Sequence, residues 1–212
     1  MTGETNSDPP RTAPIRLGKE SLNLPNLITF SRLFLALMLF ALIDSGRWML
    51  SSTFLFVFAA STDFLDGWLA RRYGQVTTLG RIMDPFVDKI IVGGAFLFLL
   101  VPGGDRSSGV TAWMVIIVIG REMFISSLRG FLEQQGRDFS ASLIGKLKMV
   151  VQCVAVTAAL LSLSPDLNWT WLPTVRDGLL WLAVGITIWS GLVYIIRAVR
   201  LLNEPPADTS GA

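Results

Sequence analysis

Six long apolar segments dominate this chain of 212 residues and limit what it can fold into. They lie at roughly residues 25–43, 49–69, 85–101, 110–130, 145–163 and 178–199, and each approaches the length of about 20 apolar residues with which a helix crosses a bilayer. Unpaired backbone groups are not tolerated in hydrocarbon, and the segments lack the alternation of barrel strands. We therefore predict an all-α integral membrane protein with six transmembrane helices.

The composition agrees with a membrane protein and excludes several other classes. Hydrophobic residues make up 51% of the chain and charged residues 16%, whereas soluble domains carry about 25% charged residues. The chain contains no histidine, which excludes Ser-His-Asp and Cys-His catalysis and histidine-based metal sites. Cys153 is the single cysteine, so a disulfide scaffold is excluded too. Any catalysis must therefore use Asp, Glu, Lys, Arg or a bound ion.

Polar segments at both ends set the expected domain organisation. Residues 1–22 are rich in proline, threonine and charge, with no apolar run near Met1, so we expect a polar cytoplasmic extension and no cleaved signal peptide. Residues 204–212 lack apolar periodicity and are expected to form a disordered tail. Residues 23–203 then form one six-helix membrane domain.

Lysine and arginine residues are divided unequally between the two sides of this predicted bundle. With six spans the termini share a side, and fifteen of the 18 basic residues fall on that side. The opposite loops hold the other three, Arg47, Arg106 and Arg176. Since Lys and Arg accumulate in cytoplasmic loops, we predict a multi-pass protein of the inner (cytoplasmic) membrane with both termini in the cytoplasm.

Four aspartates stand where the second and third apolar segments meet. Asp63 and Asp66 are three residues apart, and Asp84 and Asp88 are four residues apart, so each pair shares one helix face. A short connection folds the two helices back as antiparallel neighbours, which lets the carboxylates converge. A charge at membrane depth costs about 2.5–3.5 kcal/mol, and crowding adds repulsion. We therefore predict bound divalent cations, with Mg²⁺ or Mn²⁺ favoured over Zn²⁺ because the ligands are hard oxygens.

Small residues and an arginine accompany the first pair of aspartates. Gly67 and Ala70 share the helix face with Asp63 and Asp66 and leave room for a ligand near the backbone. Arg71 adds a planar, permanently charged group suited to phosphate oxygens. Together these features predict a polyphosphate site where two metal ions assist a phosphoryl-type transfer. The alternative is that the aspartates are helix caps and snorkelling ends near the membrane interface.

At these residues the sequence resembles the CDP-alcohol phosphotransferase family. The family pattern is Asp, two residues, Asp-Gly, two residues, Ala-Arg, eight residues, Gly, three residues, Asp, three residues, Asp. Every fixed position is filled in this chain, by Asp63, Asp66, Gly67, Ala70, Arg71, Gly80, Asp84 and Asp88. The resemblance covers roughly Asn23 to Arg200 and omits only the two tails.

The resemblance implies the family's six-helix integral membrane fold, a homodimer and two divalent cations, Mg²⁺ or Mn²⁺, in each active site. Enzymes of the family displace CMP from a CDP-linked donor with an alcohol. By resemblance, Asp63, Asp66, Asp84 and Asp88 bind metal, and Asp88 is also the base that takes the proton of the acceptor hydroxyl. The residues that would receive the cytidine diphosphate of the donor are Asp63, Gly67, Ala70, Arg71 and Gly80.

The start of the first segment is similar to those members of the family that make phosphatidylglycerol phosphate. Asn26, Thr29 and Arg32 recur every three residues there. We expect them to donate hydrogen bonds to the nucleotide and phosphates of CDP-diacylglycerol. The alternative is an N-capping and charge-anchoring role.

Basic residues later in the chain give a second similarity to the same members. They are Arg121, Lys146, Lys148, Arg129 and Arg197. We expect them to form a cationic pocket for the phosphate of glycerol 3-phosphate, because a dianionic acceptor beside an acidic metal site needs compensating charge. The alternative for Arg129, Lys148 and Arg197 is anchoring to lipid headgroups. Met149 departs from the pattern of these members, which have threonine there.

The expected reaction is the condensation of CDP-diacylglycerol with sn-glycerol 3-phosphate to phosphatidylglycerol phosphate and CMP. The same chemistry with inositol phosphate, serine or phosphatidylglycerol as acceptor stays open. A divalent-cation transporter is a remote alternative, since carboxylates in a membrane also mark ion pathways. Transporters place such sites near the bilayer midplane on broken helices, whereas these aspartates lie at helix ends. No nucleic-acid partner is expected, because the net charge is only +2.

Overall fold

The computed structural model describes the backbone of residues 24–73, 78–103, 106–135 and 143–203. Side chains are described within residues 30–62, 86–87, 89–103, 106–135 and 144–203. The predicted extension at residues 1–22 and the predicted tail at 204–212 lie outside the described residues, so both stay predictions.

The described residues form six α-helices and no strand, which confirms the all-α fold class. The helices are α1 (Leu24–Ser45), α2 (Met49–Tyr73), α3 (Thr78–Leu100), α4 (Ala112–Gln134), α5 (Leu143–Leu163) and α6 (Leu172–Asn203). Two of them begin earlier than the apolar runs that predicted them, α3 by seven residues and α6 by six. Polar residues continue a helix as readily as apolar ones, and Pro173 fits the first turn of α6, where its missing N–H is not needed.

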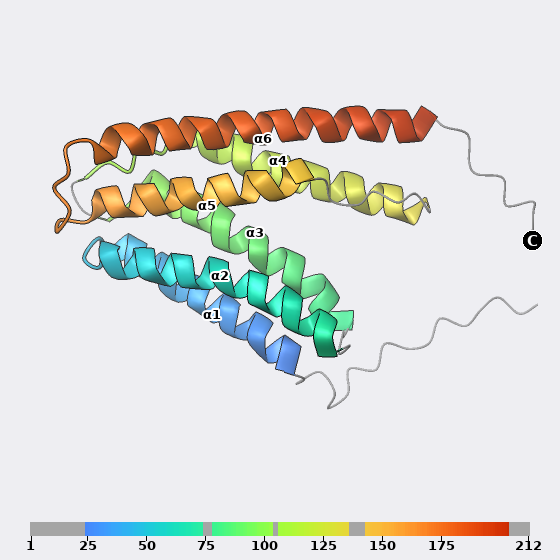
Figure 1. Ribbon diagram of the computed structural model, residues 1–212, viewed down its shortest axis with the longest axis horizontal. Coiled ribbons are helices and arrows are strands. Elements are labelled where there is room, and N and C mark those ends of the chain that lie inside the picture. Colours follow the sequence, from blue (N-terminus) through green and yellow to red (C-terminus); the bar gives the residue numbers. More distant parts are fainter. Residues whose placement is uncertain (1–23, 74–77, 104–105, 136–142, 204–212) are drawn as a thin grey trace, which may run out of the picture.

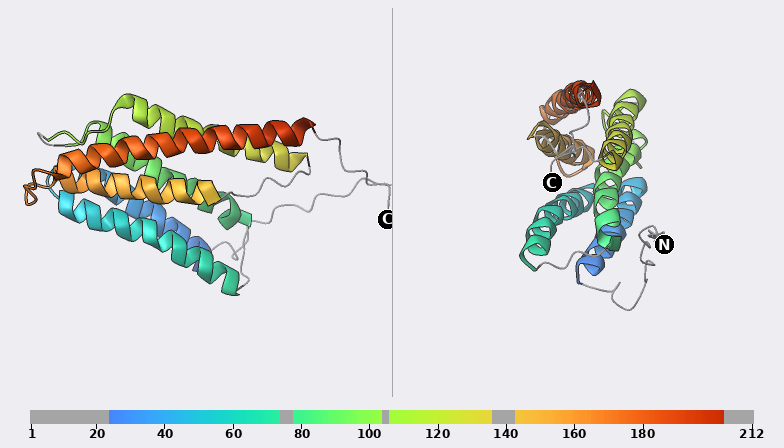
Figure 2. Two further views of the ribbon diagram at one scale, coloured as in Figure 1. Left: turned by 45° about the horizontal axis from the view of Figure 1, so that its top comes forward. Right: turned by 90° about the vertical axis from the view of Figure 1, so that its right-hand side faces the viewer.

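The helices run alternately up and down in a slender bundle (Figure 1). The start of α1 and the end of α6 lie at the same end of the molecule, together with the end of α2 and the start of α3 (Figure 1). We call this the site end, and the opposite end, which carries the connecting residues 46–48, 101–103, 106–111 and 164–171, the far end. Helix α1 packs against α2 and α3, α6 packs against α4 and α5, and α2 and α3 join these two groups by packing against α5 and α4 (Figure 2).

One continuous hydrophobic core runs through the bundle and includes residues from all six helices. Its centre holds fully buried Phe56, Phe96 and Leu160. Phe40 of α1 stacks on Phe98 of α3, with ring centroids 4.9 Å apart and an interplanar angle of 6°. A smaller cluster around Ile125 and Tyr194 joins α4 to α6 nearer the site end. The described helices are therefore fixed relative to one another by apolar packing.

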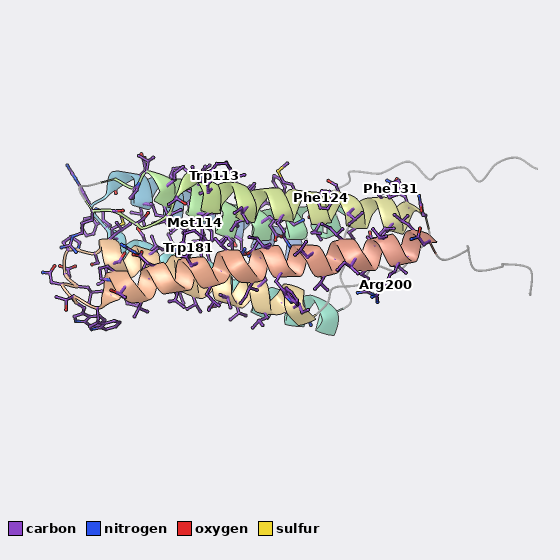
Figure 3. All side chains as sticks on the ribbon, turned by 90° about the horizontal axis from the view of Figure 1, so that it is seen from above. Trp113, Met114, Phe124, Phe131, Trp181 and Arg200 are labelled. Carbon is purple, nitrogen blue, oxygen red and sulfur yellow. The ribbon has the colours of Figure 1, made fainter. Side chains whose placement is uncertain are left out.

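The outer surface of the bundle is also apolar, which is the reverse of a soluble protein. Trp113, Phe124 and Phe131 follow one another along the outside of α4 (Figure 3), and Trp113 is 74% exposed. In the described part of the chain, the stretches Ile144–Leu163 and Leu172–Asn203 are long and apolar enough to cross a membrane, and Met49–Thr62 and Lys89–Leu100 are shorter apolar helices. These features support membrane association, while the number of six spans stays a prediction.

Two arginines fasten the connections at the far end. Arg176 of α6 is buried and donates from Nη1 to the carbonyl oxygen of Ser107 at 2.7 Å and to Ser162 Oγ at 3.2 Å. Arg106 donates to the carbonyl oxygen of Ser164 at 2.8 Å and to Asn168 Oδ1 at 2.9 Å. Two of the three basic residues assigned to this side are therefore engaged in holding the connections together.

Helices α1 and α3 approach closely at Gly94, and this contact yields a prediction about stability. A Cβ atom at Gly94 would lie 2.2 Å from Phe40 Cζ, and the ring is held by its stack on Phe98. We expect Gly94→Ala to destabilise the fold by about 1–3 kcal/mol, as overpacking does. The measurement is the thermal unfolding midpoint of the purified protein in detergent.

Gly185→Ala is the matched control. No atom lies within 4 Å of the Cβ position at Gly185, and alanine favours a helix over glycine by about 1 kcal/mol. The control should unfold at or above the wild-type midpoint. Equal midpoints for the two variants would contradict the packing assigned to Gly94.

Candidate functional site

The four predicted metal ligands lie on two helices that pack against each other. Asp63 and Asp66 belong to the last part of α2, and Asp84 and Asp88 to the first part of α3. Their side chains are outside the described set, as are those of Gly67, Ala70, Arg71 and Gly80 on the same helices. The backbone brings both pairs to the site end (Figure 1). That they share metal ions stays a prediction.

Arg32 of α1 is buried, with 2% of its surface exposed. A charge that only anchored the helix to lipid headgroups would reach the surface, so its burial does not fit the anchoring alternative. Thr29 and Asn26 lie on the same helix about one and two turns earlier, with side chains outside the described residues.

A cavity of about 570 Å³ opens between α3, α4, α5 and α6. We call it the basic pocket. Four of the five predicted acceptor residues line it, namely Arg121 and Arg129 from α4 and Lys146 and Lys148 from α5. Arg197 is not among the lining residues, although Tyr194, one turn earlier on α6, is. The structure thus brings together basic residues separated by up to 27 positions in the sequence.

The basic side chains lie at two depths. The side chain of Lys148 is 6% exposed and that of Arg121 is 11% exposed, which places both well inside the protein. Lys146 is exposed and Arg129 is half-buried. Headgroup anchoring does not explain the two deep cations, because a lysine or arginine that anchors a helix end extends toward the interface.

Glu122 connects the two deep cations. Its Oε1 accepts a hydrogen bond from Arg121 Nη1 at 2.8 Å, and the same oxygen accepts a hydrogen bond from Lys148 Nζ. The carboxylate is itself mostly buried, with 22% of its side chain exposed. This arrangement compensates part of the positive charge, because two cations share one anion.

Arg121 nevertheless retains unused donors. Its Nε and Nη2 are buried and have no hydrogen-bond partner among the described residues, and the same holds for Arg129 Nε. The Arg121 guanidinium lies over the ring of Tyr194, 5.3 Å from its centroid, within the range of a cation–π contact. Buried donors are normally satisfied, so these N–H groups are suited to donate hydrogen bonds to an anionic ligand.

Lys89, Glu122 and Gln152 line the pocket and were not among the predicted site residues, although Gln152 was expected to donate a hydrogen bond between helices. Lys89 Nζ donates to Ser126 Oγ at 2.5 Å and joins α3 to α4. Gln152 Nε2 donates to Thr187 Oγ1 at 2.8 Å and joins α5 to α6. The sequence offered a reason to consider Lys89 for the site, because it directly follows the predicted metal ligand Asp88. It offered one for Glu122 as well, because the neighbouring Arg121 was a predicted acceptor-binding residue.

The charge of the pocket suits a phosphate. Among the described residues that line it, five are basic, Lys89, Arg121, Arg129, Lys146 and Lys148, and two are acidic, Glu122 and Glu133, which gives these residues a formal net charge of +3. Since Lys89 follows Asp88 on α3, the pocket adjoins the helix that carries the second aspartate pair. A small anionic alcohol in this pocket would lie beside the predicted metal site.

The donor set on α2 and α3 fits divalent cations. Carboxylate oxygens are the ligands that Mg²⁺ and Mn²⁺ prefer, and four of them come from two packed helices. Within the side chains that the structure describes, no group of three or more Cys, Asp or Glu residues could hold a metal. The aspartates of α2 and α3 stay the predicted ligands.

Comparison with known proteins places these features in context. A family model described as CDP-alcohol phosphatidyltransferase matches residues 22–189. The chain is 35% identical over 190 residues to the CDP-diacylglycerol–glycerol-3-phosphate 3-phosphatidyltransferase of Bacillus subtilis (strain 168), covering 82% of this chain and 94% of the relative. The protein of that name from Rickettsia bellii (strain RML369-C) is 33% identical over 174 residues, covering 81% and 93%. An Arabidopsis thaliana protein, CDP-diacylglycerol–glycerol-3-phosphate 3-phosphatidyltransferase 2, is 30% identical over 204 residues, covering 91% and 87%.

The different depths of the two lysines yield a prediction about anion binding. Lys148 is buried in the pocket and Lys146 is exposed. Using sulfate as a probe of the phosphate position, we expect Lys148→Met to weaken binding about 10- to 100-fold, the range of a charge-assisted hydrogen bond. The measurement is calorimetric titration of the purified protein with sulfate.

Lys146→Met is the matched control, because it removes the same charge from a solvated position of the same pocket. Solvent screens such a charge, so this variant should lose at most about threefold in affinity. Equal losses for the two variants would show that sulfate does not reach the deep cations.

Proposed function

The chain belongs to the CDP-alcohol phosphatidyltransferase family, and on this premise we propose that it is a phosphatidylglycerophosphate synthase. It condenses CDP-diacylglycerol with sn-glycerol 3-phosphate and releases phosphatidylglycerol phosphate and CMP. The observation that carries the proposal is the basic pocket, with Arg121 and Lys148 deep inside it and Lys89 joining it to the helix of Asp88. The printed names of the relatives from bacteria and a plant support the same reaction.

The donor binds at the site end of α1, α2 and α3. Gly67, Ala70 and Gly80 let the cytidine diphosphate approach the backbone, and Arg71 and Asp63 take part in holding it. Asn26, Thr29 and Arg32 of α1 donate hydrogen bonds to the nucleotide and its phosphates. The buried position of Arg32 supports this assignment. The acyl chains stay in the lipid beside the apolar outer surface.

Asp63, Asp66, Asp84 and Asp88 hold two divalent cations, Mg²⁺ or Mn²⁺. When bound, these ions neutralise the diphosphate and stabilise the charge on the attacking and leaving oxygens. The family uses divalent metal ions, and the carboxylate donors of this chain are suited to either metal.

The acceptor phosphate binds to Arg121 and Lys148, with Lys146 and Arg129 adding positive charge in the pocket and Arg197 lying outside its lining. Asp88 takes the proton from the 1-hydroxyl of glycerol 3-phosphate. The hydroxyl oxygen then forms a bond to the phosphorus that carries diacylglycerol, and the bond between that phosphorus and the oxygen bridging to CMP breaks. CMP leaves with that oxygen. The held phosphate orients the acceptor, so that the reaction gains from proximity.

The enzyme lies in the inner membrane with six spans, both termini and the active site facing the cytoplasm, and works as a homodimer. The common end of α1 and α6 supports this topology, as do the exposed aromatic side chains and the two long apolar helices. The basic residues at that end agree with it.

A second candidate keeps the chemistry and changes the acceptor. Met149 lines the basic pocket, at a position where the members that make phosphatidylglycerol phosphate have threonine. A thioether in place of a hydroxyl removes a hydrogen-bond donor beside the acceptor. Inositol phosphate, serine and phosphatidylglycerol are therefore included as acceptors in the test.

An acceptor panel tests the proposed function. Purified protein in detergent is incubated with CDP-diacylglycerol, Mg²⁺ and one candidate acceptor, and both CMP release and the lipid product are measured. We expect release with glycerol 3-phosphate, with phosphatidylglycerol phosphate as the product, because the excess of basic residues lining the pocket favours a phosphate-bearing acceptor. An excess of EDTA should abolish turnover, and added Mg²⁺ or Mn²⁺ should restore it. If the lipid product forms with another acceptor and not with glycerol 3-phosphate, the second candidate function is the correct one.

Asp88→Asn tests the general base. The substitution keeps the size of the side chain and removes its ability to take a proton, so we expect kcat to fall by at least about 10²–10⁴-fold. Asp166→Asn is the control, since Asp166 is exposed in the connection between α5 and α6 at the far end. Both variants should unfold at the wild-type temperature. Near-normal turnover of Asp88→Asn would end the assignment.

A further inference from the structure

Arg121 and Lys148, the two buried cations of the basic pocket, are already paired with an anion, the carboxylate of Glu122. A single carboxylate oxygen, Oε1, accepts hydrogen bonds from both Arg121 Nη1 and Lys148 Nζ. The three side chains are all mostly buried, so this contact is made where solvent screening is weak. The proposed function gives no role to Glu122.

The free donors of Arg121 show how a ligand would meet this contact. Its Nε and Nη2 are buried and have no partner among the described residues. These two atoms form one edge of the guanidinium, the edge that binds two oxygens of a phosphate in a bidentate manner. Because these two atoms are buried, an anion reaches them only when neighbouring side chains shift, and Glu122 can keep Nη1 meanwhile. The ammonium group of Lys148 has three N–H donors, of which Glu122 accepts one. An anion that also binds Lys148 therefore lies close to the Glu122 carboxylate and is repelled by it.

We infer that Glu122 is a built-in competitor of the acceptor phosphate and thereby sets the affinity of the pocket. Its carboxylate accepts one donor of Arg121 and one of Lys148 when the phosphate is absent, and it repels the phosphate when the phosphate is present. Without this competitor, two buried cations would hold any phosphate tightly, including that of the product, which carries the same group. The consequence for turnover rests on the proposed function, whereas the consequence for anion binding does not.

By Coulomb's law, competition by Glu122 affects the binding of a dianion more than that of a monoanion. The repulsion between Glu122 and a bound anion is proportional to the charge of the anion. Removing the carboxylate charge must therefore strengthen the binding of a dianion more than that of a monoanion. A purely structural role, in which Glu122 orients Arg121 and Lys148, predicts weaker binding of both anions on substitution.

The experiment compares sulfate, a dianion, with methyl sulfate, a monoanion of nearly the same shape, by calorimetric titration of the purified full-length protein. For Glu122→Gln we expect sulfate to bind about tenfold more tightly, the low end of what a charge-assisted hydrogen bond contributes, and methyl sulfate about threefold more tightly. Weaker binding, no change, or equal gains for the two anions would overturn the inference.

Two control variants distinguish the effect of removing the Glu122 carboxylate from the effect of removing any nearby negative charge. Glu133 is an exposed carboxylate that lines the same pocket, and Glu133→Gln removes the same charge from a solvated position. Its effect on sulfate should stay within about twofold, and an effect as large as that of Glu122→Gln would also overturn the inference. Asp177→Asn alters a similar Arg–acid pair, between Arg176 and Asp177 at the far end, and should leave sulfate binding unchanged.

Glu122→Asp keeps the test decisive if Glu122→Gln does not fold. The shorter side chain keeps its charge and withdraws its oxygen from Lys148, so sulfate should again bind more tightly, by a smaller factor than for Glu122→Gln. Weaker sulfate binding by this variant would speak for the structural role and against competition.

Steady-state kinetics then connect the inference to the reaction. In Glu122→Gln the KM for glycerol 3-phosphate should fall several-fold and kcat should not rise, because the product phosphate leaves more slowly. A raised KM would overturn the inference even if the wild type uses glycerol 3-phosphate. A wild type that binds sulfate and does not use glycerol 3-phosphate would overturn the proposed function alone, since the titrations contain no substrate.

Discussion

Buried positive charge is the constraint on which the arrangement of α4, α5 and α6 depends. Lys148 and Arg121 lie inside a bundle whose outer faces are apolar, and an isolated charge in such surroundings is strongly unfavourable. Glu122 compensates part of this charge, Tyr194 stacks against the guanidinium, and some donors of Arg121 are left for a ligand. The helices must pack so that all these groups meet, which fixes the cavity between them.

The acidic residues of the motif and the basic residues of the pocket lie mainly on different, neighbouring helices. The acidic residues of the motif lie on α2 and the first part of α3, and the basic residues of the pocket lie mainly on α4 and α5. Helix α3 belongs to both groups, because Asp88 and Lys89 are adjacent on it. An enzyme that joins a metal-bound diphosphate to an anionic alcohol needs this separation, since one undivided site would let the two charge types neutralise each other.

Much of this organisation could be predicted from the sequence. The apolar segments gave six helices, and the motif placed its aspartates on the second and third of them. The basic residues Arg121 and Lys148 could be named because the sequence around them is similar to that of the family members that make phosphatidylglycerol phosphate. The partner of Lys148 could not be named, since Glu122 lies 26 residues away and only the packing of α4 on α5 brings them together. Arg197 was predicted to lie in the pocket, and it is not among the lining residues. The sequence does not show how α6 is rotated, because a helix that is apolar around most of its circumference gives no indication of its inward face.

The hydrogen bonds of Arg106 and Arg176 have a mechanical consequence. They tie the chain together at the end remote from the pocket, so relative tilting of the helices pivots there. Helix α6 has 32 residues and is therefore about 48 Å long. Each degree of tilt about the fastened end would displace its other end by about 0.8 Å, so the hydrogen bonds at the far end help to set where α6 places its residues at the site end.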